Sequence, residues 1–277
     1  MFSAEQKPLI MGILNVTPDS FSDGGRFETV DTALKHTEKM LAEGADIIDV
    51  GGESTRPYSL SVSAGEQIHR ILPVIRAIRS QLGDQPIISV DTRLSSVAKL
   101  ALAEGANMIN DVSAGRDDPQ LLEIAAKAGC PLVLMHRQGN SATMQDQPYY
   151  ENLLNEVISY LNHSVELALA AGVLKENLLL DPGIGFGKRQ LDDMQLLAQL
   201  PTFVALGFPI LLGSSRKRVL AELCGINNPL QLATATAATT ALGVMAGVKV
   251  FRVHDVLENR QAADVAWAIK QQLTCPT

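Results

Sequence analysis

Polar side chains follow short apolar runs along this chain, each at or near the point where a run ends. The residues concerned are Asn15, Asp49, Asp91, Asn110, His136, Asp181, Ser214, Ser215, Arg216, Lys217, Arg252 and His254. Carboxylates and amides recognise polar groups by hydrogen bonding, and arginine, lysine and histidine bind anions. If the apolar runs are parallel strands of a barrel, their carboxyl ends meet at one edge. The pattern therefore predicts an active site at that edge.

The distribution of charge favours a small anionic substrate over a nucleic acid. The formal net charge is -7, whereas proteins that track a phosphate backbone usually carry a basic surface. Six cationic side chains nevertheless come just after predicted strands: Arg56, Lys188, Arg216, Lys217, Arg252 and His254. Cations gathered at one rim of an acidic protein are expected to attract a small anion.

The length and composition allow one large α/β domain or two small ones. With 277 residues, 46% of them hydrophobic, the chain can bury a core. Its three cysteines lie far apart without paired spacing, which predicts neither a zinc site nor a disulfide framework and favours a cytoplasmic location. Residues 1–7 lack the order of a signal peptide, and threonines interrupt the low-charge stretch near 230–248, so we expect no membrane segment.

Eight apolar stretches alternate with eight amphipathic ones, which is the count of a (β/α)8 barrel. Strands are predicted near 9–14, 46–50, 87–91, 107–112, 131–135, 177–181, 209–213 and 248–253, and helices near 29–43, 63–81, 95–104, 118–128, 151–171, 190–200, 229–246 and 256–273. The strands are apolar without strict alternation, as in parallel strands buried on both faces. We predict a single TIM barrel domain over residues 1–277. Its long polar loops, 15–25 and 51–57, are typical of loops that close over a substrate.

A doubly wound open sheet shows the same alternation and is the main competing architecture. The chain has no glycine-rich dinucleotide turn after the first strand. Its functional-looking residues also follow nearly every strand, whereas in an open sheet they cluster at a switch point. Both features favour the barrel, in which all eight carboxyl ends face one mouth.

Several stretches of the sequence resemble the dihydropteroate synthase family. The matching motifs are residues 12–25, 49–57, 89–92, 109–111, 181–188, 215–217 and 252–255. They are distributed along almost the whole chain, in the family's order. The resemblance implies a pterin-binding barrel that condenses 6-hydroxymethyl-7,8-dihydropterin diphosphate with p-aminobenzoate, assisted by Mg2+, to give 7,8-dihydropteroate and diphosphate. It also implies a homodimer, and sulfonamides as competitors of p-aminobenzoate.

The resemblance assigns the pterin to a group of acids, an amide and a lysine. These and two neighbouring residues are Asp91, Asn110, Met135, Asp181, Gly185 and Lys217. The pyrimidine edge of a pterin presents an N–H and an amino group side by side, and one carboxylate can accept both hydrogen bonds. Asp181 is the family-matched candidate for this fork, and Lys217 is expected to donate to the ring. A lone aspartate at a strand end could instead cap a loop or helix.

Arg252 and His254 are two residues apart on the last predicted strand, so their side chains share a face. In a closed barrel they neighbour Asn15, at the end of the first strand. The resemblance implies that these residues and Thr55 bind the diphosphate. Asn15 would be the Mg2+ ligand, because its amide oxygen suits a hard cation that keeps most of its waters.

The resemblance also implies an apolar wall and a carboxylate site for p-aminobenzoate. The residues assigned are Phe21, Thr55, Arg56, Pro57, Phe186, Ser215 and Lys217. Phe21, Pro57 and Phe186 would form the wall, and Arg56 would organise its loop. Ser215 would receive the carboxylate at a helix predicted to begin near residue 214. The alternative for Phe21 and Phe186, less favoured, is that they are ordinary core aromatics.

No residue of the sequence looks like a covalent nucleophile, because the attacking atom is the aniline nitrogen of the second substrate. We expect catalysis by positioning and by electrostatic help to the departing diphosphate. The residues expected to contribute are Asp19, Asp23, Asp91, Lys217, Arg252 and His254. We hypothesise a dissociative route through a cationic methylene that Asp19 and Asp23 steady, although both could instead cap turns.

Two other functions remain open on sequence grounds. A methyltetrahydrofolate-binding methyltransferase barrel shares the pterin-recognition residues but needs no Arg252–His254 clamp. A barrel that only binds pterin would tolerate loss of the catalytic residues, which are intact here. The small-residue stretch 233–246 is a candidate dimer surface or simple packing against the barrel. No specific role is assigned to His136 or Arg137, and Glu53 is expected to hold its own loop.

Overall fold

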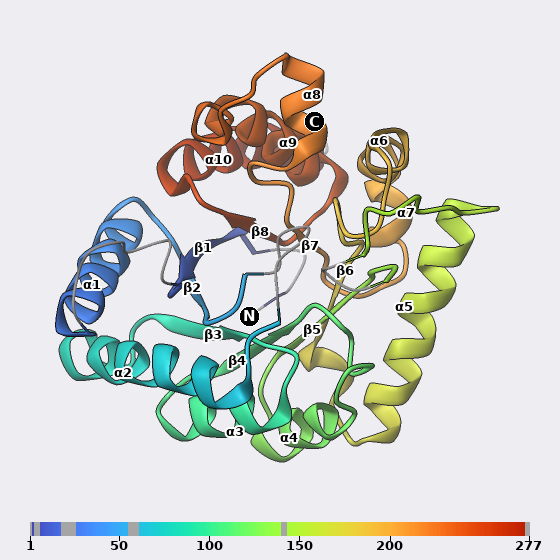
Figure 1. Ribbon diagram of the computed structural model, residues 1–277. Helices are drawn as coiled ribbons and strands as arrows, with labels where there is room; N and C mark the ends of the chain where they lie inside the picture. The colour runs from blue at the N-terminus through green and yellow to red at the C-terminus, as the bar shows by residue number, and fades with distance from the viewer. Residues whose placement is uncertain (1, 3–5, 18–25, 55–60, 140–142, 275–277) are drawn as a thin grey trace.

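The computed structural model describes residues 2, 6–17, 26–54, 61–139 and 143–274. Six residues with predicted roles lie outside these ranges: Asp19, Phe21, Asp23, Thr55, Arg56 and Pro57. Within the described ranges, helices surround a central ring of strands (Figure 1). The remaining residues with predicted roles can therefore be placed on the fold.

Eight parallel strands form the barrel. In chain order they are β1 Leu9–Asn15, β2 Ile47–Gly51, β3 Ile87–Asp91, β4 Met108–Asp111, β5 Leu132–Met135, β6 Leu178–Asp181, β7 Leu211–Leu212 and β8 Val250–Val253. They are hydrogen-bonded in the order β6-β5-β4-β3-β2-β1-β8-β7. A parallel bridge between Leu180 and Ile210 joins β6 to the residue before β7. The sheet thus closes on itself, which confirms the predicted (β/α)8 barrel and excludes the open sheet.

The outer layer contains the predicted helices and two short additional ones. The helices are α1 Arg26–Ala42, α2 Ala64–Leu82, α3 Ser95–Ala103, α4 Gln120–Ala128, α5 Leu153–Ala170, α6 Gln190–Ala198, α7 Leu200–Val204, α8 Arg218–Cys224, α9 Ala233–Ala246 and α10 Val256–Thr274. The prediction of a helix start near residue 214 was wrong, because α8 begins at Arg218. Arg216 has a φ of 57°, in the left-handed region, so the chain cannot enter a right-handed helix before that residue.

Alternation along the strands places polar side chains inside the barrel, because successive side chains point to opposite faces. One inner layer is apolar and contains Met11, Ile47, Met108, Val133, Leu179, Leu211 and Val250. Two residues further along the same strands come Ile13, Asp49, Asn110, Met135, Asp181, Gly213 and Arg252. Residues between these positions, such as Ile48 and Ile109, belong to the larger core beneath the helices. The polar side chains therefore point into the barrel, at the end of the strands that forms the carboxyl-terminal mouth.

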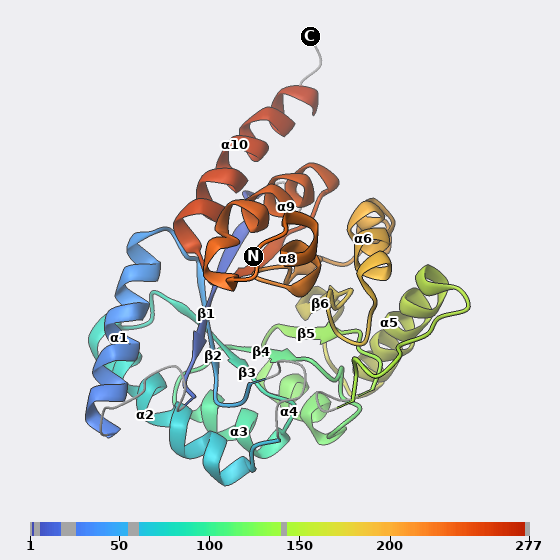
Figure 2. The ribbon, with the colours of Figure 1, turned by 45° about the horizontal axis from the view of Figure 1, so that its top comes forward.

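Helices α9 and α10 lie side by side against one side of the barrel (Figures 1 and 2). Three of the four threonines of α9 are buried: Thr236, Thr239 and Thr240. Thr236 Oγ1 donates to Leu232 O at 2.9 Å, and Thr240 Oγ1 donates to Asn259 Oδ1 of α10 at 2.7 Å. These bonds satisfy polar groups inside an otherwise apolar stretch. Over the described residues, no helix combines the length and apolar character needed to cross a membrane.

Candidate active site

A cavity of about 390 Å3 lies at the carboxyl ends of the strands. Every described residue with a predicted site role lines it except Asp91: Asn15, Asn110, Met135, Asp181, Gly185, Phe186, Ser215, Lys217, Arg252 and His254. These positions come from the ends of β1, β4, β5, β6, β7 and β8 and from the loops that follow them. The barrel thus gathers widely separated residues at one mouth, as predicted.

Arg252 is held between two carboxylates on the inner face of the barrel. Its Nε donates to Asp49 Oδ2 at 2.6 Å, and its Nη2 donates to Asp91 Oδ2 at 2.7 Å. Asn110 Nδ2 also donates to Asp49 Oδ2, at 3.1 Å. Asp49 is fully buried, and its Oδ1 has no hydrogen-bond partner among the described residues. Asp91 does not line the cavity, but it contacts Arg252, which does.

Asp49 contacts two of the predicted site residues, Asn110 and Arg252, although the sequence placed it only at the polar edge of the barrel without a specific role. Its position was nevertheless informative, because it lies two residues after Ile47 on the inner face of β2. Counting in steps of two along each strand would have placed it beside Arg252 and Asn110. Asp49 orients both of these side chains from below the cavity.

Burial shifts the pKa values of the charged groups at the mouth. Burial raises the pKa of Asp181 to about 6, although the hydrogen bond from the Gly183 N–H and the charge of Lys217 act to lower it. Burial also raises the pKa of Asp91 to about 7, opposed by Arg252. For Lys217, burial and then the charge of Arg252 lower the pKa to about 8. Asp181 is therefore mainly anionic, and Lys217 mainly cationic, between about pH 6 and pH 8.

Phe186 and Lys217 form one wall of the cavity. The Lys217 ammonium lies 4.1 Å from the centre of the Phe186 ring, within the range of a cation–π contact. Phe186 packs in a small apolar cluster with Val112, Met135 and Met144. This corner presents an aromatic face beside a positive charge, which suits an aromatic ligand that carries an anionic group.

Ser215 is bound to His254 and does not begin a helix. Its Oγ accepts a hydrogen bond from the His254 N–H at 3.1 Å and lies 3.0 Å from His254 Nδ1. Either atom of this second contact can be the donor, because the tautomer of the His254 ring decides which of them carries the proton. The neighbouring Arg216 is held by Asp255, with Nε donating to Oδ2 at 3.0 Å. The turn after β7 is therefore tied to the end of β8.

Lys188 is a buried cation in the wall of the cavity, which it helps to line. Its Nζ lies 2.9 Å from His136 Nδ1 and donates to the carbonyl oxygens of Gly183 at 2.7 Å and Phe186 at 3.1 Å. Burial lowers the pKa of Lys188 to about 7 and, together with the charge of Lys188, lowers that of His136 to about 2. The neutral imidazole therefore accepts from the ammonium. The sequence identified Lys188 only as a cation that follows a predicted strand. Its partners could not be predicted, because two of them are backbone carbonyls.

Two glycines let this loop pack directly against the segment after β5. Gly183 and Gly187 have φ values of 69° and 65°. A Cβ at Gly183 would overlap the carbonyl oxygen of His136, and one at Gly187 would overlap that of Gln138. Both positions therefore require glycine for backbone conformation and for close approach.

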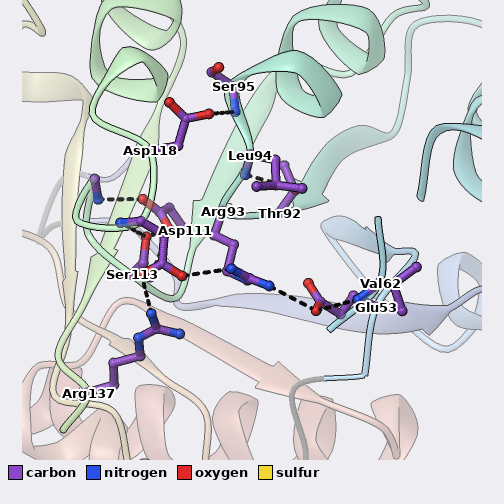
Figure 3. A network of polar contacts seen from close by, with 12 residues as sticks. Glu53, Val62, Thr92, Arg93, Leu94, Ser95, Asp111, Ser113, Asp118 and Arg137 are labelled. Atoms are coloured by element: carbon purple, nitrogen blue, oxygen red, sulfur yellow. Dashed lines mark hydrogen bonds and ion pairs between the residues drawn. The ribbon is translucent and has the colours of Figure 1, made fainter. Parts of the chain in front are cut away.

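An ion-pair network connects four loops along the rim (Figure 3). Arg93 Nη2 donates to Glu53 Oε1 at 3.1 Å and its Nη1 donates to Asp117 Oδ2 at 2.9 Å. Arg137 pairs with Asp117 from the other side. Glu53 Oε1 also accepts from the Val62 N–H at 3.0 Å, so it holds the root of its own loop, as predicted. The network gives Arg137 a structural role after β5.

Known proteins resemble this chain over nearly its full length. A family model described as "Pterin binding enzyme" matches residues 11–254. A dihydropteroate synthase of Synechocystis is 42% identical over 269 residues, which are 97% of this chain and 92% of that protein. Solved dihydropteroate synthases from Yersinia pestis, in complex with a sulfonamide drug, and from Xanthomonas albilineans, with 4-aminobenzoic acid, are each 42% identical with a TM-score of 0.89. They cover 96% and 98% of this chain, and this chain covers 95% of each of them.

Proposed function

The chain belongs to the pterin-binding enzymes as a dihydropteroate synthase, and from this premise we propose how its barrel mouth works. The reaction joins 6-hydroxymethyl-7,8-dihydropterin diphosphate to p-aminobenzoate and yields 7,8-dihydropteroate and diphosphate. One observation carries the proposal: Asp181, Asn110 and Lys217 meet Arg252 and His254 in a single cavity. The first three suit a heterocycle with donors and acceptors, and the last two suit a diphosphate.

The pterin subsite is formed by Asp181, Asn110 and Lys217. Asp181 Oδ1 accepts from the Gly183 N–H at 2.6 Å, which fixes the plane of the carboxylate. In that orientation it accepts from the N–H and amino group of the pyrimidine edge. Asn110 Nδ2 gives one of its two protons to Asp49, so its Oδ1 and its second N–H are the groups left for the ligand. Lys217 donates to the ring from the opposite wall, and Met135 and Gly185 line the pocket.

The diphosphate subsite contains Arg252 and His254, with Thr55 by family resemblance. Arg252 is pre-oriented by Asp49 and Asp91, so its remaining donors need no reorganisation when charge develops on the leaving group. We propose a dissociative displacement in which the bond to diphosphate breaks before the arylamine adds, with Asp19 and Asp23 steadying the cationic methylene. A secondary kinetic isotope effect near unity at that methylene would contradict this route.

The p-aminobenzoate subsite uses the aromatic wall of Phe186 and the charge of Lys217. Ser215 contacts the substrate from the turn that precedes α8 rather than from a helix N-terminus. Phe21, Thr55, Arg56 and Pro57, which lie outside the described residues, complete the subsite by family resemblance. Sulfonamides, which also carry an aniline ring, are expected to compete for this wall.

Mg2+ is the proposed metal, and Asn15 its proposed protein ligand. No set of three His, Cys, Asp or Glu side chains within the described residues could hold a metal. Mg2+ commonly uses one or two protein oxygens together with water and substrate phosphates. A Cβ at Gly51 would lie 3.5 Å from Asn15 Oδ1 and 3.4 Å from Asp91 Cβ, so glycine keeps the space beside this amide open. When bound, the ion would neutralise charge on the diphosphate.

Replacement of Asn15 by alanine is expected to raise the Mg2+ concentration for half-maximal activity by roughly tenfold, the effect of losing one metal contact. Affinity for 6-hydroxymethylpterin, which lacks the diphosphate, should stay unchanged. Mg2+ titrations of turnover and calorimetry with the pterin alcohol measure the two quantities. An unchanged Mg2+ requirement would remove Asn15 from the metal site.

The pH dependence of kcat/KM for the pterin substrate is expected to be bell-shaped, with limbs near pH 6 and pH 8. Below the lower limb Asp181 takes up a proton and cannot accept both hydrogen bonds. Above the upper limb Lys217 loses its charge. Lys217→Arg should remove the alkaline limb, because a guanidinium does not titrate in this range. An alkaline limb that is unchanged in this variant would assign it to another group.

Purified protein with dihydropterin diphosphate and Mg2+ should release diphosphate continuously, over many turnovers, only when p-aminobenzoate is added. Dihydropteroate should form in equal amount, and Lys217→Ala should abolish both products. A methyltransferase or a barrel that only binds pterin would release no diphosphate. The assay therefore separates the three functions that the sequence left open.

We propose a homodimer that is formed through α9. The outer face of this helix carries Thr234, Ala238, Leu242 and Met245, of which Leu242 is 68% exposed. An apolar stripe with small residues lets two helices approach closely. Leu242→Glu is expected to convert the dimer to a monomer in sedimentation analysis, whereas Leu100→Glu on α3 should leave it intact. A wild-type monomer, or a dimer in Leu242→Glu, would contradict the proposal.

We also propose a cytoplasmic location. The thiols of Cys130 and Cys224 are free, and Cys224 on α8 is exposed to solvent. A reducing compartment preserves an exposed thiol of this kind.

A further inference from the structure

The ammonium of Lys188 is completely enclosed, with 1% of the residue exposed. An ammonium has three N–H donors, and here each one has an acceptor: His136 Nδ1, Gly183 O and Phe186 O. Burying a cation is costly unless its hydrogen bonds are complete. The structure meets this requirement in full, yet the proposed reaction gives Lys188 no contact with either substrate.

Two of the three acceptors are the ends of one tight turn. The Gly183 carbonyl also accepts from the Phe186 N–H at 3.1 Å, which closes the turn. The tip of the turn is held from outside, with the Gly185 N–H donating to Asp193 Oδ1 at 2.7 Å. Lys188 Nζ therefore bridges the two ends of the turn.

We propose that Lys188 is a positioning residue for the p-aminobenzoate subsite. It fixes the backbone of Phe186 and, through the Phe186 ring, the Lys217 ammonium 4.1 Å away. The inference rests on the proposed function in one respect, namely that Phe186 forms the wall for the arylamine. His136 takes part as the neutral acceptor that completes the coordination of the ammonium.

The pterin subsite has separate anchors and is expected to survive loss of Lys188. The Asp181 carboxylate is fixed by the Gly183 N–H, and the Asp181 carbonyl accepts from the His136 N–H at 2.9 Å. Gly183 itself packs against the His136 carbonyl oxygen. Lys188 makes neither of these hydrogen bonds. It acts on Asp181 only through its charge, which lowers the pKa of the carboxyl after the effects of Gly183 and Lys217, so its loss is expected to act mainly on the Phe186 end of the turn.

The test is Lys188→Met, which keeps the length of the side chain and removes the three donors. KM for p-aminobenzoate should rise by roughly tenfold or more, the scale expected for a wall displaced by a fraction of an ångström. The dissociation constant of dihydropterin diphosphate, measured by calorimetry without p-aminobenzoate, should change by less than about twofold. Hydrogen exchange at the Gly185 and Phe186 amides should become faster, independently of activity.

Lys249 offers a matched control at the opposite end of the barrel. It is also buried, and its Nζ donates to the carbonyl oxygens of Gln6 and Lys7. Lys249→Met should lower the melting temperature without changing KM for p-aminobenzoate. An equal rise of KM in the two variants would mean that Lys188 is merely structural, and would overturn the proposal.

Phe186→Ala separates failure of the inference from failure of the proposed function. If Phe186→Ala raises KM for p-aminobenzoate and Lys188→Met does not, the positioning role is wrong. If Phe186→Ala leaves KM unchanged, Phe186 is not the wall and the proposed subsite is wrong. A rise in the pterin dissociation constant as large as the rise in KM would also overturn the role of Lys188.

His136 provides a second variant pair in case Lys188→Met does not fold. His136→Gln retains an acceptor for the ammonium, whereas His136→Leu removes it. His136→Leu should raise KM for p-aminobenzoate several-fold, and His136→Gln should restore most of the loss. Equal effects of the two substitutions would show that the ring packs but does not fix Lys188.

Discussion

Asp181→Asn is expected to weaken binding of dihydropterin diphosphate by roughly 100- to 10,000-fold, which corresponds to the loss of two hydrogen bonds to a charged acceptor. The Gly183 N–H would still require an oxygen at its present position. The amide therefore turns its NH2 group towards the pyrimidine edge, where it meets two donors. Calorimetry with the pterin substrate measures the effect directly.

The same substitution should not destabilise the fold. Asp181 has a pKa of about 6, above its usual value of 3.8, because burial disfavours the charge. The folded protein therefore binds this proton more tightly than the unfolded chain, so the ionised carboxyl costs stability progressively as pH rises from about 4 through 6. At pH 8 the neutral amide of the Asp181→Asn variant removes that cost, and the free energy of unfolding should be equal to or above that of the wild type.

Asp111→Asn is the matched control for this experiment. Asp111 is also buried at a strand end, but it caps its own loop by accepting from the N–H groups of Ser113 at 2.7 Å and Gly115 at 2.6 Å. Its replacement should lower stability and leave pterin affinity unchanged. Pterin binding that is retained in Asp181→Asn, or lost equally in Asp111→Asn, would refute the fork at Asp181.

Arg252→Met is expected to destabilise the protein by about 3–5 kcal/mol at pH 8, the cost of removing one partner from a buried ion pair. Asp49 and Asp91 would then share the barrel interior without a cation between them. Turnover should fall by roughly 100- to 1,000-fold in the folded fraction, because a donor to the diphosphate is lost. Urea unfolding and initial rates under conditions where the variant is folded measure the two effects.

The loss of stability should be smaller at pH 6 than at pH 8. The pKa of Asp91 is already raised to about 7 by burial, and Arg252 acts to lower it. Without Arg252 this pKa rises further, so the carboxyl is protonated at pH 6 and the repulsion from Asp49 is relieved.

The double variant Asp91→Asn/Arg252→Met distinguishes the structural role of Arg252 from its catalytic role. One of the two isolated carboxylates is then neutral, so stability should recover in part relative to Arg252→Met. Turnover should remain low, because the guanidinium is still absent. Recovery of turnover together with stability would show that Arg252 serves only to neutralise Asp49 and Asp91.

The barrel and much of its mouth could be predicted because they depend on local patterns. Apolar runs that end in polar residues locate the carboxyl ends of the strands, and parallel barrel topology brings those ends together. These two patterns are sufficient to predict that Asn110, Asp181 and Arg252 lie in one cavity. The position of Asp49 beside them follows from the two-residue period of β2.

The partners of these residues could not be predicted, because they come from distant segments or from the backbone. Arg93 pairs with Glu53, 40 residues away, and nothing in either local sequence selects the other. Lys188 is fixed by two carbonyl oxygens, which every residue possesses. The start of α8 depended on a left-handed conformation at Arg216, a residue type that rarely adopts it.

The glycines at 183 and 187 restrict how this enzyme could escape a drug that imitates p-aminobenzoate. Any side chain at either position would collide with the carbonyl oxygens of His136 or Gln138, so a substitution there must displace the backbone of the neighbouring segment. If Phe186 forms the wall for p-aminobenzoate, as proposed, selection is left with side-chain changes that reshape this wall, and these also touch the natural substrate. Resistance would therefore carry a catalytic cost from its first mutation.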